Sequence, residues 1–172
     1  MLAYMPPSVE GMTLTTVPEG YHTVTPWLIS RDAAGLVDFI LDVFEGQDLG
    51  RVEHEGKIGH AEVRVGDSVI MLFDARDHWP ATPGFLRLYV ADDAAVLERA
   101  VAHGGWVHTR PTEMFWGDRV SRMRDPFGNL WWIHQRVAQP DEADLLRRMA
   151  VPEFQKAMEY VQGRDLFDEA PQ

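Results

Sequence analysis

Apolar residues along this chain change their spacing in a fixed order, and that order occurs twice. In each half an alternating stretch precedes one with apolar residues three or four positions apart, and three further alternating stretches follow. Alternation is typical of a half-buried strand, and the longer spacing is typical of an amphipathic helix. The expected elements lie at residues 24–29, 36–44, 49–55, 58–65 and 68–73 in the first half, and at 85–90, 94–102, 106–109, 118–124 and 129–136 in the second.

Two sets of landmarks indicate an internal repeat. Asp32 and Asp92, which are expected to cap the two helices, lie 60 residues apart. Gly66 and Gly128, in the turns before each last strand, lie 62 residues apart. Their near agreement predicts two copies of a strand–helix–three-strand unit, a βαβββ module. One module leaves the apolar face of its sheet uncovered, so we expect the two copies to bury it together.

The ends of the chain lack this repeat. The expected segments are an N-terminal arm at 1–20, a domain at 21–137 with modules at about 21–75 and 84–137, and a C-terminal helical tail at 138–172. The arm contains three prolines and no periodicity. Within the tail, short helices are expected at 141–149 and 152–162. Each has an apolar stripe, which predicts packing on the domain or on a second subunit.

Composition narrows the classes of function. The 172 residues include 16 Lys and Arg against 27 Asp and Glu, a net charge of −11, whereas nucleic-acid-binding proteins need a basic face. The absence of cysteine excludes disulfides, thiolate zinc sites and cysteine nucleophiles. No apolar run reaches the roughly 18 residues of a membrane span, and residues 1–20 do not resemble a secretion signal. We therefore expect a cytoplasmic protein with no nucleic-acid or membrane partner.

Three stretches of the chain resemble a known superfamily. They are Gly59–Leu72 in the first module, and Met114–Arg119 and Asp125–Trp131 in the second. Together they are similar to the vicinal oxygen chelate superfamily, which includes glyoxalase I, extradiol dioxygenases and bleomycin-resistance proteins, and most of all to its PhnB-like branch. The resemblance implies an α+β fold in which two βαβββ modules form a curved eight-stranded mixed sheet, with extra C-terminal helices here. It also implies that the sheet forms a cup for a small-molecule ligand, often completed by a partner subunit, so a homodimer is expected.

The resemblance further implies where a catalytic member would hold a divalent metal. The ligands in such members are His, Gln or Glu on the first strand and Glu on the last strand of each module. Carried over by motif, these positions are Thr25, Ile70, Phe85 and Trp132. Three of them lack a donor atom, and a single hydroxyl group does not hold a metal. The expectation is a metal-independent site with no cofactor.

A different metal site or an acid–base site remains open. His60 and Glu62 share one face of a strand, and His134 shares the face of Trp132 in the last strand. If these strands are neighbours, the three side chains are candidates for a two-His, one-carboxylate site or for catalytic acid–base groups. The alternative is that His60 and Glu62 are hydrogen-bonded polar residues in a hydrated cup.

Strand parity predicts the lining of the cup. The carried-over metal positions place Ile70 and Leu72 there, and the expected ligand-binding residues combine aromatic rings with arginines. These are Trp27, Phe85, Arg87, Tyr89, Trp116, Arg122, Arg124 and Trp132. The arginines are expected to meet carboxylate, phenolate or carbonyl oxygens, with internal pairing or exposure as the alternative. Trp116 is equally consistent with a lid and with a core or dimer contact.

Three functions are consistent with these features. The first is metal-independent binding of a small aromatic or partly anionic organic molecule, for example to sequester an antibiotic or a metabolite. The second is an isomerase, lyase, cyclase or dioxygenase that uses His60, Glu62 and His134 as acid–base groups or as a non-standard metal site. The third is a protein–protein module whose binding surface is the pair of C-terminal helices.

Overall fold

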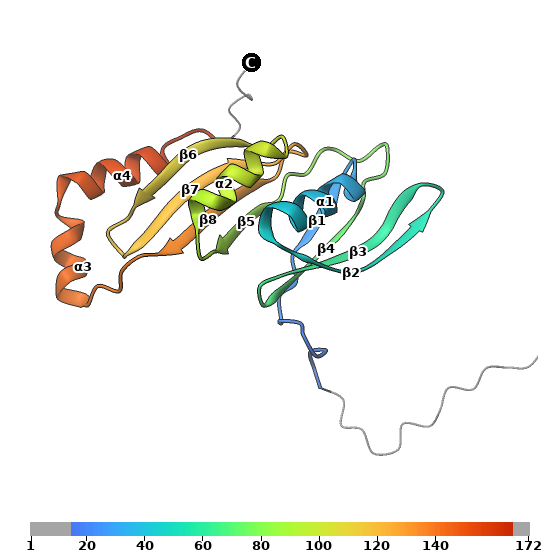
Figure 1. Cartoon of the computed structure of the whole chain (residues 1–172), viewed down its shortest axis with the longest axis horizontal. Coiled ribbons are helices and arrows are strands. Elements are labelled where there is room, and N and C mark those ends of the chain that lie inside the picture. The colour runs from blue at the N-terminus through green and yellow to red at the C-terminus, as the bar shows by residue number, and fades with distance from the viewer. Residues whose placement is uncertain (1–14, 167–172) are drawn as a thin grey trace, which may run out of the picture.

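The computed structural model describes residues 15–166, which fold into two consecutive βαβββ modules followed by two helices (Figure 1). The elements of the first module are β1 (Trp27–Ser30), α1 (Ala33–Phe44), β2 (Gln47–His54), β3 (Lys57–Val65) and β4 (Ser68–Asp74). Those of the second are β5 (Phe85–Tyr89), α2 (Asp93–Ala102), β6 (Trp106–Glu113), β7 (Asp118–Arg124) and β8 (Leu130–Arg136). The C-terminal helices are α3 (Glu142–Met149) and α4 (Pro152–Gln162). This order agrees with the one predicted from the sequence.

Each module forms its own four-stranded mixed sheet, in the orders β1-β4-β3-β2 and β5-β8-β7-β6. In each sheet the first strand of the module pairs in parallel with the last, and the other pairs are antiparallel. Within residues 15–166 no strand of one sheet pairs with a strand of the other. The predicted α+β class with paired modules is confirmed, and its eight strands are divided between two hydrogen-bonded sheets.

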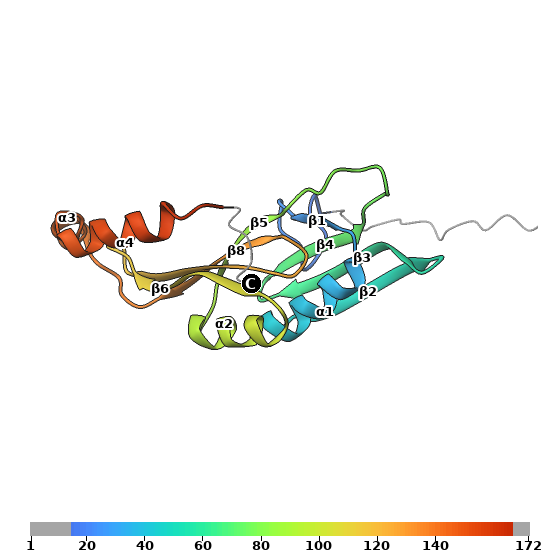
Figure 2. The same ribbon diagram turned by 90° about the horizontal axis from the view of Figure 1, so that it is seen from above.

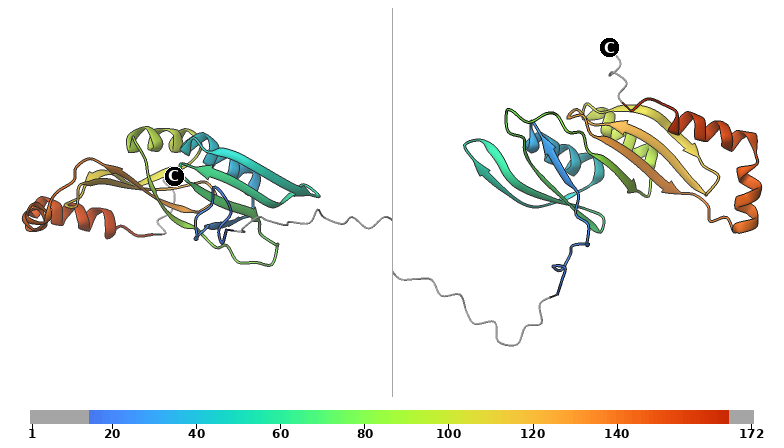
Figure 3. Two further views of the ribbon diagram at one scale, coloured as in Figure 1. Left: turned by 90° about the horizontal axis from the view of Figure 1, so that it is seen from below. Right: turned by 180° about the vertical axis from the view of Figure 1, so that it is seen from behind.

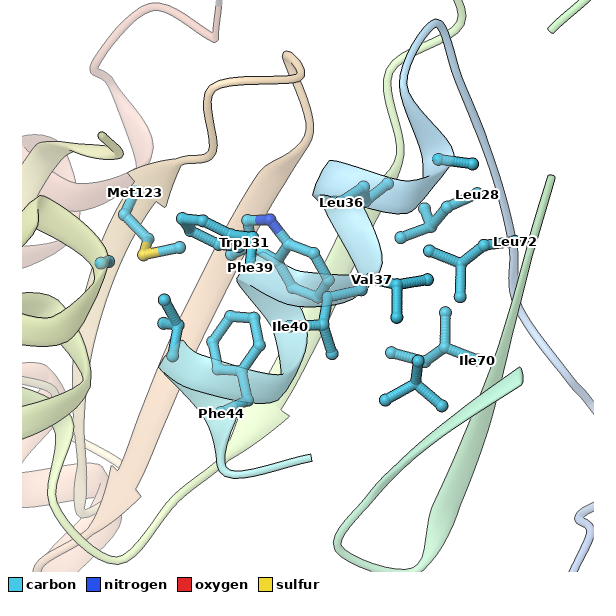
Figure 4. Packing of buried hydrophobic residues seen from close by; sticks show 14 of the residues in the cluster. Leu28, Leu36, Val37, Phe39, Ile40, Phe44, Ile70, Leu72, Met123 and Trp131 are labelled. Atoms are coloured by element: carbon cyan, nitrogen blue, oxygen red, sulfur yellow. The ribbon is translucent and has the colours of Figure 1, made fainter. Parts of the chain in front are cut away.

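A shared core joins the two modules. Helices α1 and α2 lie side by side on one side of the sheets (Figures 1 and 2), and their apolar faces pack against the strands. Helix α1 begins where the Asp32 carboxylate accepts a hydrogen bond from the backbone N–H of Gly35 at 2.8 Å, as predicted for a capping residue. Figure 4 shows the centre of the core, where the ring centroids of Phe44 in α1 and Trp131 in β8 lie 4.7 Å apart.

Ile70 and Leu72 lie on the helix side of β4, so the prediction that they face the cup is wrong. Both side chains are buried in the shared core. Met71, between them, lies on the opposite side, where its sulfur accepts a hydrogen bond from the indole N–H of Trp27. Strand β4 therefore presents Met71, rather than Ile70, on the side of the sheet that lacks α1 and α2.

The two turns that precede the last strands account for this error. Strand β4 follows a tight turn in which Val65 pairs with Ser68, whereas β8 follows a longer turn in which Arg124 pairs with Leu130. Gly66 and Gly128 are therefore not at equivalent positions in their turns. A count of four residues from each glycine reaches the open side in β8 but is one residue out of register in β4. A displacement of one residue exchanges the two faces of a strand.

Helix α4 covers part of the sheet side that α1 and α2 leave free. It packs on β6 and β7, and Figures 2 and 3 show it on the opposite side of the sheets from α1 and α2. Ala157 and Val161 of α4 are buried with Met114 and Val120. Helix α4 thus packs on the domain itself, which is one of the two predicted arrangements, whereas α3 packs against α4. None of the helices in the described part of the chain is long and apolar enough to span a membrane.

Candidate functional site

The sheet side opposite α1 and α2, called the open face below, carries exposed aromatic rings. In β5, leucines alternate toward the shared core, so Phe85, Arg87 and Tyr89 project from the open face. Trp27, Phe85 and Tyr89 are 59%, 55% and 58% exposed. Large apolar side chains gathered on one exposed face often mark a binding surface.

A pocket of about 460 Å³ lies on the open face of the second module. Its lining residues are Phe85, Leu86, Arg87, Trp116, Trp132, His134 and Gln162. Strands β5 and β8 supply most of them, the turn before β7 supplies Trp116, and α4 supplies Gln162. This open-face pocket gathers most of the second-module residues that the sequence singles out.

Tyr89 and Trp27, two of the predicted aromatic residues, lie outside the open-face pocket. Tyr89 lines a second hollow, of about 400 Å³, where the two modules meet. Arg87 borders both hollows, and its guanidinium lies 5.5 Å from the centroid of the Tyr89 ring. Trp27 belongs to the first module, where it packs edge-on against Phe73 with 5.4 Å between the ring centroids. The guanidinium of Arg87 could therefore bind an anionic group in either hollow.

His134 is held by a buried carboxylate. Its Nδ1 lies 3.1 Å from Oδ2 of Asp118, and both residues are 4% exposed. The polar groups of the Trp116 and Tyr89 side chains also act on the Asp118 carboxylate and help to lower its pKa. Nε2 of His134 is buried and has no hydrogen-bond partner within residues 15–166. A carboxylate on one ring nitrogen orients the imidazole and directs the other nitrogen to a different partner.

The electrostatics of this pair favour a neutral imidazole. Burial lowers the pKa of His134 below its usual value, and the positive charge of Arg87 acts in the same direction, against the opposing hydrogen bond to Asp118. For Asp118, burial would raise the pKa, but the hydrogen bonds from His134, Trp116 and Tyr89 outweigh it and leave the pKa lowered. A neutral imidazole that donates from Nδ1 to Asp118 has its free lone pair on Nε2.

We expect acid to destabilise the wild-type protein more than a variant without His134. The lowered pKa of folded His134 means that the unfolded chain, with a His pKa of about 6.5, takes up its proton first as the pH falls. The contribution of neutral His134 to the free energy of unfolding is complete above about pH 6.5 and is lost as the pH falls below it. The gap in unfolding free energy between wild type and His134→Phe should therefore narrow between about pH 7.5 and about pH 5, as urea denaturation measures. A constant or widening gap would contradict the assignment.

His60 and Glu62 form a separate polar pair in the first module. Nε2 of His60 lies 3.2 Å from Oε1 of Glu62, and the Tyr21 hydroxyl donates to the other carboxylate oxygen. Within residues 15–166 no group of three or more His, Asp or Glu side chains converges to hold a metal ion. The hypothesis of a two-His, one-carboxylate site with His134 is therefore wrong for the described part of a single chain. The sequence cannot reveal this, because it does not place the two sheets relative to each other.

Arg122 and Arg124 make contacts with the chain itself. Arg122 is fully buried, and its guanidinium donates to the backbone carbonyls of Val161 and Arg164, both at 2.8 Å. Its guanidinium carbon lies 5.0 Å from the Trp132 ring centroid. Arg124 donates to the carbonyl of Leu166 at 2.9 Å. The expected ligand contacts are replaced by bonds to Val161 in the last turn of α4, where helix carbonyls lack partners and the dipole favours a cation, and to the segment that follows the helix.

Two residues of the site are missed by the sequence reasoning. Asp118 lies in a stretch that carries the family resemblance, but its role depends on the diagonal placement of His134 across the β7–β8 pair. A signal was available, because hairpin register places the start of β7 beside the end of β8. Gln162 enters the pocket only because α4 folds back on the open face, and no pattern in its own helix indicates that.

Paired βαβββ modules, with a pocket on the sheet side opposite α1 and α2, define the class of α+β domain to which this chain belongs. Residues 21–133 match the family model described as the Glyoxalase/Bleomycin resistance protein/Dioxygenase superfamily, and the chain belongs to that superfamily. It is 33% identical over 139 residues to an uncharacterized protein of Mycobacterium bovis, covering 74% of this chain and 91% of the relative. The same identity and length relate it to an uncharacterized protein of Mycobacterium tuberculosis, of which 82% is covered.

Solved structures share the fold at low sequence identity. TioX from Micromonospora sp. ML1 is 24% identical with a TM-score of 0.57, over 66% of this chain and 97% of that one. The fosfomycin resistance protein FosX from Mesorhizobium loti is 14% identical with a TM-score of 0.50, over 73% of this chain and 97% of that one. At these identities the likeness extends to the fold alone.

The positions that correspond to the superfamily metal ligands do not suit a metal in this chain. Register across the parallel pairs places Met71 opposite Trp27 and Trp132 opposite Arg87, so Met71 takes the place first assigned to Ile70. The four positions are then Thr25, Met71, Phe85 and Trp132. They contain no carboxylate and no imidazole, the usual ligands of divalent metals in such sites.

Proposed function

We propose that this chain binds a small aromatic or partly anionic organic molecule in the open-face pocket, without a metal ion. The observation that carries the proposal is the pocket itself, where the rings of Phe85, Trp116 and Trp132 surround a hollow that also contains Arg87. A volume of about 460 Å³ is in the range of small-molecule sites, which combine apolar walls with a few polar groups. The guanidinium would bind an anionic or carbonyl oxygen, and the rings would stack on the ligand.

Metal independence is the second part of the proposal. It is supported by the donor set, because thioether and aromatic side chains replace the expected His, Gln or Glu ligands at three of the four family positions. The ligand would then be held by stacking and by hydrogen bonds rather than by chelation. Sequestration of an antibiotic or metabolite in the cytoplasm is the role that this chemistry fits best, in a chain of the PhnB-like branch.

A homodimer is part of the same proposal. Trp27 of the first module and Phe85 of the second are more than half exposed on the open face. A second copy that covers these rings would enclose the pocket and remove apolar surface from water. Sedimentation or light scattering of the full chain tests this part separately from ligand binding.

Substitution of Trp132 by alanine is expected to weaken ligand binding about tenfold with the fold retained, because the ring supplies stacking area in the pocket. The measurement is calorimetric titration with planar aromatic acids, together with thermal unfolding. Trp79→Ala is the matched control, because Trp79 lies in the loop between β4 and β5, outside the pocket, and its loss should leave affinity unchanged. Equal loss of affinity in both variants would contradict the assigned pocket. Stoichiometric metal retained through dialysis, and required for binding, would contradict metal independence.

An acid–base enzyme is the second candidate function, and the Asp118–His134 pair favours it. A neutral imidazole oriented by a carboxylate is the usual form of a general base. Turnover of a bound ligand that is lost in His134→Phe, while binding of that ligand persists, would support the enzyme over sequestration.

A further inference from the structure

We propose that His134 determines the specificity of the open-face pocket, where its Nε2 accepts a hydrogen bond from a hydroxyl or N–H group of an aromatic ligand whose anionic group is bound by Arg87. This inference rests on the proposed function, because it names the chemical class that the same pocket selects. The ligand class is thus an aromatic acid that also carries a hydrogen-bond donor, such as a phenol carboxylic acid.

The first step of the argument is that only one nitrogen of His134 is available. Nδ1 lies 3.1 Å from the Asp118 carboxylate, which can only accept a hydrogen bond when it is ionised. Asp118 is itself 4% exposed, and the pair lies 3.1 Å apart across β7 and β8, so the carboxylate is held against this nitrogen. The proton of the imidazole therefore stays on Nδ1, and Nε2 is an acceptor.

The second step is that this acceptor is unsatisfied. Nε2 is buried in a residue that is only 4% exposed, and it has no hydrogen-bond partner within residues 15–166. Leaving a buried acceptor unpaired is unfavourable, so a donor brought by a ligand relieves an existing cost in the free protein. A site built in this way rejects an analogue that lacks the donor more strongly than an apolar pocket would.

The third step concerns the neighbours of His134 in the pocket. Arg87 lies on the adjacent strand β5, and its positive charge helps to keep the imidazole neutral. The same guanidinium is a bidentate partner for a carboxylate. Trp132 lies two residues from His134 on the same strand face. Arg87 would therefore bind the anionic group of the ligand, Trp132 would stack on its aromatic ring, and His134 would accept a hydrogen bond from its donor group.

Entry to Nε2 depends on the turn that holds Trp116. Trp116 is the pocket residue that lies in a turn rather than in a strand or helix. The next residue, Gly117, has a φ of 92° and approaches the Ala138 carbonyl so closely that an added Cβ would lie 2.4 Å from that oxygen. Only glycine fits there, so the conformation of the turn that places Trp116 in the pocket with His134 depends on Gly117.

Matched ligand pairs test the proposal on the full chain. The probes are the three isomeric hydroxybenzoates and their methyl ethers, titrated by calorimetry into wild type, His134→Phe and His108→Phe. At least one hydroxybenzoate should bind wild type about five to a hundred times more tightly than its ether. The preference should vanish in His134→Phe. It should persist in His108→Phe, which alters another buried histidine on β6, outside the pocket.

The outcomes separate the two proposals. If none of the aromatic acids binds wild type, the proposed function fails and the inference fails with it. If they bind but hydroxyl and ether forms bind equally, or if His134→Phe keeps the preference, the inference alone is overturned. Thermal unfolding of each variant establishes that it is folded under the conditions of titration.

The tautomer of His134 gives a readout that needs no ligand. Nitrogen-15 shifts of the ring should show Nδ1 protonated and Nε2 unprotonated at neutral pH, and a hydroxybenzoate should shift the Nε2 signal. Asp118→Asn replaces the carboxylate beside Nδ1 by an amide that can also donate, so the preference for a proton on Nδ1 should weaken in that variant. A protonated Nε2 in the wild-type protein without ligand would overturn the inference.

Discussion

Replacing Arg122 with methionine is expected to destabilise the folded protein by about 3 kcal/mol and to loosen α4 from the open face. The guanidinium is fully buried and donates to the backbone carbonyl of Val161 in α4 and to those of Arg164 and Asp165 just after the helix. Methionine keeps an unbranched apolar stem but has no donors, so it would leave these carbonyls without those bonds. Urea unfolding measures the loss of stability, and amide hydrogen exchange over 152–162 measures the loosening.

The matched control for this prediction is Arg147→Met. Arg147 is an exposed arginine on α3 whose ion pair with Asp144 is local to that helix, and exposed pairs of this kind contribute at most about 1 kcal/mol. Its replacement should change neither exchange in α4 nor the binding of aromatic acids. If the amides of α4 stay equally protected in Arg122→Met, the role of Arg122 as the anchor of that helix is wrong.

Arg122 also shows where reasoning from the sequence stops. Its strand parity is read correctly, because the side chain does lie opposite the shared core, beside Trp132. Helix α4 occupies that side of the sheet. Its apolar stripe could pack on many different surfaces, so the stripe alone does not identify this one. Periodicity gives the existence of a helix and its apolar face, but not the surface on which it packs. The sequence therefore predicts that Arg122 binds a ligand, whereas in the structure it binds backbone carbonyls of this chain.

The fold itself follows from local patterns. Alternation, helical spacing and capping aspartates recur in both halves, and local and global preferences agree, so the element order is predictable. The face of β4 was misassigned because two turns of different length were treated as equivalent at Gly66 and Gly128. A register error of one residue leaves the fold class intact but exchanges core and site residues. The site is therefore more sensitive to turn geometry than the fold is.

The Asp118–His134 pair illustrates the other limit. Both residues are visible in the sequence, but their contact depends on the antiparallel register of β7 and β8, and their burial depends on the covering turn. Burial sets the direction of the pKa shift of His134, and no spacing rule gives burial. Conversely, His60 and Glu62 contact each other because they are two residues apart on one strand, which the sequence does reveal. Local contacts are predictable, and contacts between sheets are not.

Alanine at Trp131 is expected to have the largest effect on stability, a loss of about 3–5 kcal/mol. Trp131 is fully buried, its indole N–H donates to the Asp125 carboxylate at 2.8 Å, and its ring contacts Phe44 of the other module. Truncation would open a cavity at the junction of the modules and remove a donor from a buried carboxylate. Urea or thermal unfolding measures the loss.

The adjacent residue, Trp132, is the matched control, because it has the same side chain on the opposite face of β8. It is only partly buried, so Trp132→Ala should cost no more than about 1–2 kcal/mol while weakening ligand binding about tenfold. Trp131→Ala, where it remains folded, should bind aromatic acids with nearly wild-type affinity. The opposite result, with stability lost at Trp132 and affinity lost at Trp131, would mean that the faces of β8 are exchanged. Such an exchange would remove both the open-face pocket and the role of His134, because Trp132 and His134 share one face of that strand.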